Sequence, residues 1–196
     1  QITTFEKFKK WLFRVTVLYC IWMIFYSPLW FNLDNLRGTL LDAFIGYFVL
    51  WYLAGVIVGG SILFLCRNMN PKYLIILSIF LYLIGYFLQQ IGNLHIFTGH
   101  LDKIINWLPI SRNFLFDCFP LLAIGLLIRK TNLDSKLKIS ITLVFLSILL
   151  VILESYLNYK FISSKDPLDH LLTILITAPI IFIYVKNIKI MGNNKN

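Results

Sequence analysis

Residues 73–91 read Y-L-I-I-L-S-I-F-L-Y-L-I-G-Y-F-L-Q-Q-I, a run of 19 residues without a charged side chain. A helix needs about 20 mostly apolar residues to cross the hydrocarbon core of a bilayer. This run therefore predicts a membrane-spanning helix.

Five further apolar runs qualify, or nearly qualify, as membrane spans by the same criterion. They lie at 11–30, 43–66, 113–128, 137–156 and 170–185. The runs at 113–128 and 170–185 are the shortest and require a locally thinned bilayer or snorkelling ends. The sequence thus predicts an all-α fold, a polytopic membrane helix bundle with six transmembrane helices. Residues 1–196 are expected to form a single integral membrane domain.

The composition agrees with a membrane location. Of the 196 residues, 59% are hydrophobic and 14% are charged, whereas soluble domains are about half apolar and about a quarter charged. The formal net charge of +9 would suggest nucleic-acid binding in a soluble protein. Basic residues also flank membrane helices on the cytoplasmic side, and that explanation fits here. We therefore expect the lipid bilayer as a partner, and no nucleic acid.

The distribution of lysine and arginine predicts the orientation of the chain. With the N-terminus inside and six alternating spans, the cytoplasmic side receives Lys7, Lys9, Lys10, Arg14, Arg67, Lys72, Arg129, Lys130, Lys136, Lys138, Lys186, Lys189 and Lys195. The outer side keeps Arg37, Lys103, Arg112, Lys160 and Lys165. Basic segments remain in the cytoplasm. The asymmetry of 13 to 5 among the 18 basic residues therefore predicts that both termini are cytoplasmic.

Acids and histidines gather on the opposite side, in the outer connections 31–42, 92–112 and 157–169 and at the neighbouring helix ends. They are Asp34, Asp42, Asp102, Asp117, Glu154, Asp166, Asp169, His95, His100 and His170. We therefore expect polar chemistry at the outer mouth of the bundle. The three cysteines lie far apart and no Cys/His spacing suggests a metal site, so neither a disulfide framework nor a metal is expected.

The segment 111–120, S-R-N-F-L-F-D-C-F-P, places charge beside an apolar helix. Ser111 is the predicted N-cap of that helix. Asn113 and Asp117 are four residues apart and share a helix face, and the long side chain of Arg112 reaches Asp117. This pair either anchors the helix at the membrane interface or faces a polar cavity and binds substrate, as ionisable groups within spans commonly do.

Other residues of the predicted spans have a packing interpretation beside a functional one. Gly55 and Gly59 form a small-xxx-small pair that lets another helix approach closely. Pro120 predicts a kink in its helix because it lacks an N–H group. Trp51 and Tyr52 lie deeper than an interfacial belt, so they either pack between helices or line an acceptor or acyl site.

Glu154 ends the run at 137–156 on the outer side, where it is either solvated or paired with His170. No phosphate-binding loop, nucleophile elbow, zinc-protease motif or dinucleotide-binding motif occurs in the sequence. From residues and spacing alone, the prediction ends at a small polytopic membrane protein with a polar outer mouth.

Three stretches resemble the membrane-bound acyltransferase 3 family, whose members include enzymes that O-acetylate surface polysaccharides. They are F-E-K-F-K-K-W-L-F-R-V-T-V-L-Y-C-I-W at 5–22, F-I-G-Y-F-V-L-W-Y-L-A-G-V-I-V-G at 44–59 and S-R-N-F-L-F-D-C-F-P-L-L-A-I-G-L-L-I at 111–128. The third is similar to the family's Arg-Asn-Phe-Leu-Phe … Phe-Pro … Gly helix and is the most specific. In order and spacing, the three resemble the C-terminal portion of the family's domain.

Two departures from the family pattern accompany this resemblance. Val49 stands where the family has a histidine before Leu-Trp-Tyr-Leu, so a group that accepts a proton is missing there. The family's N-terminal portion, which carries a histidine implicated in catalysis, has no counterpart in this chain. We therefore expect a C-terminal fragment or a degenerate copy that is inactive alone.

The resemblance implies acyl transfer in a bacterial cytoplasmic membrane. The donor would be an acyl-CoA, expected to be acetyl-CoA, reached from the cytoplasm, and the acceptor a hydroxyl of a cell-surface glycan or a related molecule. No tightly bound cofactor is expected. The reaction needs a base, which this sequence does not identify, and donors for the developing oxyanion.

Arg112 is the candidate for an oxyanion donor or for binding an anionic group of the donor substrate. The full set of substrate-binding candidates is Arg112, Asn113, Asp117, Trp51, Tyr52 and Glu154. The competing class of function is a small membrane transporter or a non-catalytic membrane subunit.

Overall fold

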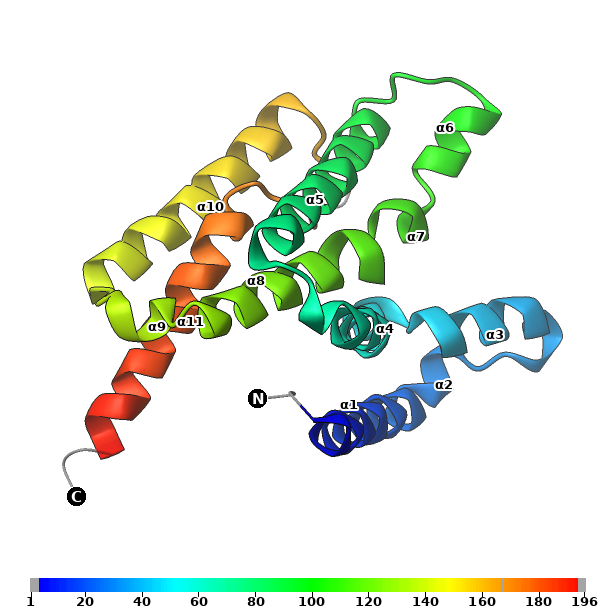
Figure 1. Ribbon diagram of the computed structural model, residues 1–196. Coiled ribbons are helices and arrows are strands. Elements are labelled where there is room, and N and C mark those ends of the chain that lie inside the picture. The colour runs from blue at the N-terminus through cyan, green and yellow to red at the C-terminus, as the bar shows by residue number, and fades with distance from the viewer. Residues whose placement is uncertain (1–3, 167, 194–196) are drawn as a thin grey trace.

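The computed structural model describes residues 4–166 and 168–193, and all regular structure in these ranges is helical (Figure 1). This confirms the all-α prediction. Among the described residues, three helices are long and apolar enough to cross a membrane: Phe48–Asn68, Pro71–Asn93 and Ile141–Phe161. A shorter apolar helix covers Ile174–Ile188. These are the helices of a multi-pass membrane protein.

The best-predicted helices are α5 (Pro71–Asn93) and α10 (Ile141–Phe161). Each begins at a polar cap. The Asn70 side chain accepts a hydrogen bond from the backbone of Lys72, and that of Ser140 accepts one from Leu143. Side-chain caps satisfy backbone N–H groups that have no partner in the first turn. The last helix, α11 (Ile174–Asn193), lies beside α10 (Figure 1).

The first predicted span differs from the structure at its start and is interrupted near its end. Helix α1 (Phe5–Phe25) begins six residues before the predicted boundary at Trp11, and α2 (Ser27–Trp30) follows after a break at Tyr26. The basic residues of the lead-in thus lie on α1 itself rather than before it. Helix α1 is not among the three long apolar helices.

The prediction of one continuous helix over 43–66 is wrong. Helix α3 (Leu36–Ile45) ends at Gly46, and after the turn η2 (Phe48–Leu50) a new helix, α4 (Trp51–Leu65), begins, followed by η3 (Cys66–Asn68). Gly46 has φ +99°, and a Cβ atom there would lie 2.5 Å from the backbone nitrogen of Trp51. Only glycine tolerates that conformation and that contact, so the apolar pattern continues while the helix does not.

The fourth predicted span is a π-helical turn, η4 (Phe114–Cys118), followed by α8 (Phe119–Lys130). The prediction of Ser111 as N-cap is wrong. Ser111 ends the short helix α7 (Leu108–Ser111). The Asn113 side chain caps η4 instead, because its oxygen accepts hydrogen bonds from the backbone N–H groups of Leu115 and Phe116. Pro120 is the second residue of α8 rather than a mid-helix residue. Its missing N–H group therefore lies at the junction between the π-helical turn η4 and the α-helix α8. A π-turn at such a junction changes the direction of the helix.

The glycines of α4 explain how the helices come together. A Cβ atom on Gly55 would lie 2.5 Å from the sulfur of Cys118, and one on Gly59 would lie 3.0 Å from the backbone nitrogen of Phe119. This confirms the predicted close approach of the small-xxx-small pair, with η4 and α8 as the partner. On the other side of α4, Gly60 lies under the ring of Trp11 from α1. A buried cluster of Leu74, Phe119, Ala123 and Leu127 joins α5 to α8.

Candidate functional site

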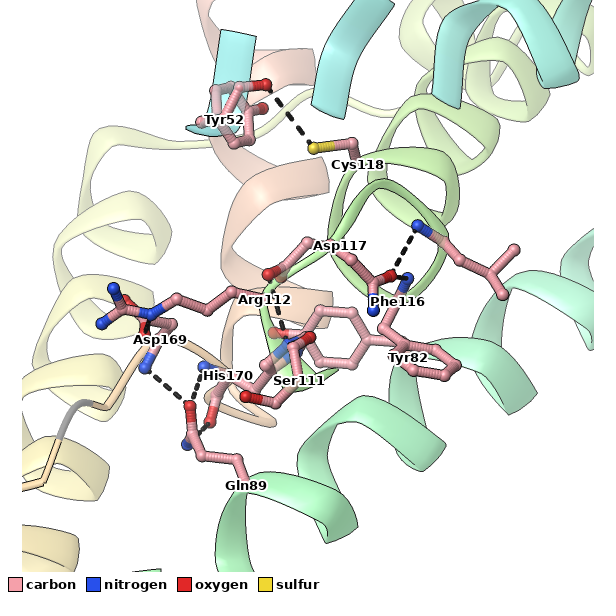
Figure 2. Close-up of polar contacts among 12 residues, drawn as sticks. Tyr52, Tyr82, Gln89, Ser111, Arg112, Phe116, Asp117, Cys118, Asp169 and His170 are labelled. Carbon is pink, nitrogen blue, oxygen red and sulfur yellow. Dashed lines mark hydrogen bonds and ion pairs between the residues drawn. The ribbon is translucent and has the colours of Figure 1, made fainter. Parts of the chain in front are cut away.

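Gln89 of α5 holds the irregular segment that connects α10 to α11. Its side-chain oxygen accepts hydrogen bonds from the backbone N–H groups of Asp169 and His170, at 2.8 and 2.9 Å. Its amide nitrogen donates to the carbonyl oxygen of His170 at 3.0 Å (Figure 2). Backbone groups that are buried outside a helix need such partners. Gln89 therefore fixes the backbone that carries the ionisable side chains of Asp169 and His170.

His170 is fully buried. Its Nε2 atom lies 2.9 Å from the carbonyl oxygen of Ser111, and because a carbonyl oxygen only accepts, we assign the proton to Nε2. The ring packs edge-on against Tyr82, whose hydroxyl donates to the carbonyl oxygen of Leu171 at 2.8 Å. A Cβ atom on Gly85 would lie 2.8 Å from the imidazole ring, so glycine is required beneath it.

Asp117 lies beside His170 rather than beside Arg112. One carboxylate oxygen, Oδ2, is 3.2 Å from Nε2 of His170, and the residue is 6% exposed. This oxygen does not have hydrogen-bond geometry with a described partner, and the same holds for Nδ1 of His170. Asp117 and His170 therefore lie within ion-pair distance but share no hydrogen bond, because the proton on Nε2 of His170 points to the carbonyl oxygen of Ser111. The two buried groups form the interior part of the site.

The predicted pairing of Arg112 with Asp117 is wrong. Nε of Arg112 instead donates to the carboxylate of Asp169, which lies 57 residues further along the chain. Figure 2 shows that Arg112 extends toward Asp169, whereas the carboxylate of Asp117 points toward His170. Arg112 thus has an acid partner at the edge of the site and remains 21% exposed.

Arg112 lines two neighbouring cavities. The larger, of about 340 Å³, is also lined by Asp42, Trp51 and Trp107. The second, of about 280 Å³, is also lined by Trp51 and Asn113. The structure therefore brings together three of the predicted site residues, Arg112, Trp51 and Asn113. It adds Asp42 and Trp107, which the sequence analysis did not select.

Tyr52 and Asn113 have structural contacts of their own. The backbone carbonyl of Tyr52 accepts a long contact of 3.7 Å from the thiol of Cys118, and its side chain is 44% exposed. The side-chain nitrogen of Asn113 donates to the carbonyl oxygen of Ile110 at 3.0 Å, while its oxygen caps η4. Tyr52 is not among the residues that line the two cavities.

Glu154 does not pair with His170. Its carboxylate accepts hydrogen bonds from the backbone N–H groups of Leu172 and Thr173, each at 2.8 Å, and from the Thr173 hydroxyl at 2.5 Å. These residues directly precede α11, where an acid also suits the helix dipole. Glu154 therefore joins α10 to the start of α11, away from the cavities that Arg112 lines.

A second polar cluster links the connection that follows α5 with the connection that follows α10. Nδ1 of His95 lies 3.0 Å from the carboxylate of Asp102, and Nε2 lies 3.4 Å from that of Asp166. Asn106 donates to Asp102 at 3.0 Å. The hydrogen bond with Asp102, and then its charge, raise the pKa of the His95 imidazole above its usual range. Within the described residues, no group of three or more His, Cys, Asp and Glu side chains has a metal-binding arrangement.

The residues missed by sequence reasoning are those whose partners lie far away in the chain. Gln89 and His170 are 81 residues apart, yet they share two hydrogen bonds. The run D-P-L-D-H at 166–170 signals polarity before an apolar helix, but it does not identify the groups it meets. Comparison of the chain with family models, with curated proteins and with solved structures gave no match.

Proposed function

We propose that the chain acts in a multi-pass membrane acyltransferase with six spans and with both termini in the cytoplasm. The reaction would move an acyl group, expected to be acetyl, from acyl-CoA to a hydroxyl of a cell-surface glycan or a related acceptor. The observation that carries the proposal is the placement of Arg112, which is held by Asp169 and lines two cavities together with Trp51.

The groups around the larger cavity support a hydroxyl-rich acceptor. Trp51 and Trp107 offer flat apolar surfaces, and Asp42 offers a carboxylate that accepts hydrogen bonds from hydroxyl groups. Binding pockets typically combine apolar walls with a few polar groups that orient the ligand. A sugar presents both kinds of surface, a ring face and a rim of hydroxyls.

Arg112 supplies what acyl transfer requires at the carbonyl. Attack of a hydroxyl places negative charge on the acyl oxygen, and fixed donors stabilise that charge. Asp169 engages Nε of Arg112, which leaves the terminal nitrogens of the guanidinium as further donors. The proposal assigns no general base to this chain, since His170 is fully buried and a base must reach the proton it removes.

The test is transfer of labelled acetyl groups from acetyl-CoA to the glycan fraction, in membranes that contain the protein expressed from its whole gene. Arg112→Lys keeps the charge but loses the planar fork. We expect it to lower transfer by about 100-fold, as removal of an oxyanion donor does in other enzymes. Arg37→Lys, on an exposed part of α3, is the matched control and should transfer at the parental rate. Parental transfer by both Arg112→Lys and Arg112→Ala would refute the proposal.

A transporter is the second candidate, and the buried pair of His170 and Asp117 favours it. Ionisable groups inside membrane bundles often form proton relays, and these two lie 3.2 Å apart with little exposure. Uptake of a labelled solute into vesicles under a pH gradient, abolished by His170→Gln and without transfer of acetyl groups, would support this alternative over the enzyme.

A further inference from the structure

An apolar groove lies at the end of α4 that is opposite to Trp51 and the Arg112 cavities. Its volume is about 360 Å³. Helices α1, α4, α8 and α11 supply its apolar walls, which include Trp11, Leu63, Leu126 and Phe182. Apolar walls of this kind favour a hydrocarbon chain over a polar solute.

Cations gather at this groove. Arg67, Arg129 and Lys186 line it, and the side chain of the adjacent Lys130 donates to the carbonyl oxygen of Arg67. Asp134, which is 3% exposed, pairs with Arg129 at 3.6 Å and with Lys186. One buried acid thus serves two of the cations.

Arg67 has no acid partner in the described part of the chain. It donates to the carbonyl oxygen of Phe64 at 2.8 Å, and its guanidinium lies 3.9 Å from the centre of the Phe64 ring. Both contacts hold the side chain in place and leave its charge uncompensated. A positive charge that is fixed at the rim of an apolar groove favours an anion at that point.

We propose that this groove binds an anionic phospholipid, with the phosphate at Arg67 and an acyl chain along Trp11 and Leu126. The planar guanidinium suits a phosphate better than an ammonium does. Gly60 and Arg67 both line the groove, and seven helical residues correspond to roughly 10 Å along the axis. That length lets one molecule contact the cation with its headgroup and the apolar wall with its first methylenes. The inference is independent of the proposed enzymatic activity.

Gly125 provides a way to block the groove without disturbing the fold. It lines the groove, and a Cβ atom added to it would meet nothing within 4 Å. A leucine at this position of α8 therefore fills space that an acyl chain would occupy, while a helix-forming residue replaces glycine.

The experiment is native mass spectrometry of the detergent-purified protein, titrated with phosphatidylglycerol or with phosphatidylcholine of the same chains. We expect the parent to bind phosphatidylglycerol at least about tenfold more tightly, which corresponds to about 1.4 kcal/mol. Arg67→Gln and Gly125→Leu should each remove about that preference. Lys72 and Ile148 are exposed and do not line the groove. Lys72→Gln and Ile148→Phe are therefore the controls, and both should bind the two lipids as the parent does.

Equal binding of the two lipids by the parent would overturn the proposal, and so would parental binding by both Arg67→Gln and Gly125→Leu. Displacement of phosphatidylglycerol by equimolar acetyl-CoA would also overturn it, because the groove would then be a donor site. Thermal unfolding of each variant in the same detergent separates lost binding from lost folding. Because Gly125→Leu changes no charge and Arg67→Gln adds no bulk, agreement between them tests both parts of the site.

Discussion

The two ends of the helices hold their charges in different ways. At the end that carries Arg112, the two charged side chains of segment 112–117 lie beside an opposite or titratable partner: Asp169 contacts Arg112, and Asp117 lies near His170. At the end that carries Arg67, cations outnumber the acid that is buried among them. The first arrangement orders the connection between two helices, whereas the second leaves charge available for a ligand from outside. Arg112 also lines two cavities, so an acid partner and access to a ligand coexist at the first end.

The largest effect on stability should come from Gln89, which binds the backbone of residues 169–170 before α11. Gln89→Leu leaves the buried N–H and carbonyl groups of His170, and the half-buried N–H group of Asp169, without their partner. Each of the two buried groups costs about 1–3 kcal/mol, so we expect a loss of about 2–6 kcal/mol in thermal or chemical unfolding.

The neighbouring residue Gln90 provides the control for this prediction. Its amide nitrogen donates to the side chain of Asn158 at 2.9 Å. Gln90→Leu removes that one bond between side chains and should cost about 1 kcal/mol. Equal losses for the two variants would show that the segment before α11 does not depend on Gln89.

A second prediction compares the glycine contacts of the two regions. A Cβ atom on Gly59 would lie 3.0 Å from the backbone nitrogen of Phe119, whereas one on Gly125 would meet nothing within 4 Å. Gly59→Ala should destabilise the protein by about 1–3 kcal/mol because α4 and α8 must separate. Gly125→Ala should stabilise it by about 0.5–1 kcal/mol. Unfolding measured side by side in one detergent checks both signs, and a stabilising Gly59→Ala would contradict the close packing.

The smallest effect concerns the pH response of the connection that follows α5, which contains His95. The pKa of His95 is raised by Asp102, so the folded state binds this proton more tightly than the unfolded state. The stabilising contact is complete below the unfolded pKa of about 6.5 and is lost as the pH rises through the higher folded pKa. Hydrogen exchange of residues 94–106 should therefore show less protection at about pH 8 than at about pH 6, after correction for intrinsic rates.

Substitutions of the two histidines of this connection sharpen the pH prediction. His95→Gln should remove the pH dependence, whereas His100→Gln should leave it. None of the three histidines, His95, His100 and His170, lines the apolar groove at Arg67. A comparable pH response of residues 129–138 would contradict the assignment to His95.

Apolar length made part of this fold predictable. Helix α5 extends two residues beyond the predicted run 73–91 at each end, whereas α10 begins four residues inside the predicted run 137–156 and ends five residues beyond it. Both helices were predictable because an uninterrupted apolar run allows few alternatives to a helix in lipid. The break at Gly46 was missed because the apolar pattern continues through it. Its signal is a single glycine, and glycine within a helix is tolerated too often to mark a boundary.

The candidate site was predictable in its residue types but not in its partners. Sequence spacing suggested that Arg112 contacts Asp117, five residues away, because both were placed on one regular helix. The π-turn η4 and its cap at Asn113 change that geometry, and the acid that Arg112 meets lies in another connection. Pairings of this kind depend on how helices pack, which local propensity does not determine.

We propose that the end of the helices that carries Arg112 and the end that carries Arg67 lie on opposite sides of a membrane, with the Arg67 end in the cytoplasm. The most direct test places single cysteines at Thr98 and at Leu133, with Cys20 and Cys66 changed to serine and the buried Cys118 retained. An impermeant maleimide is then applied to intact and to permeabilised cells. The account predicts that Thr98→Cys is labelled in intact cells and that Leu133→Cys is labelled only after permeabilisation. Labelling of Leu133→Cys from outside, with Thr98→Cys protected, would contradict it.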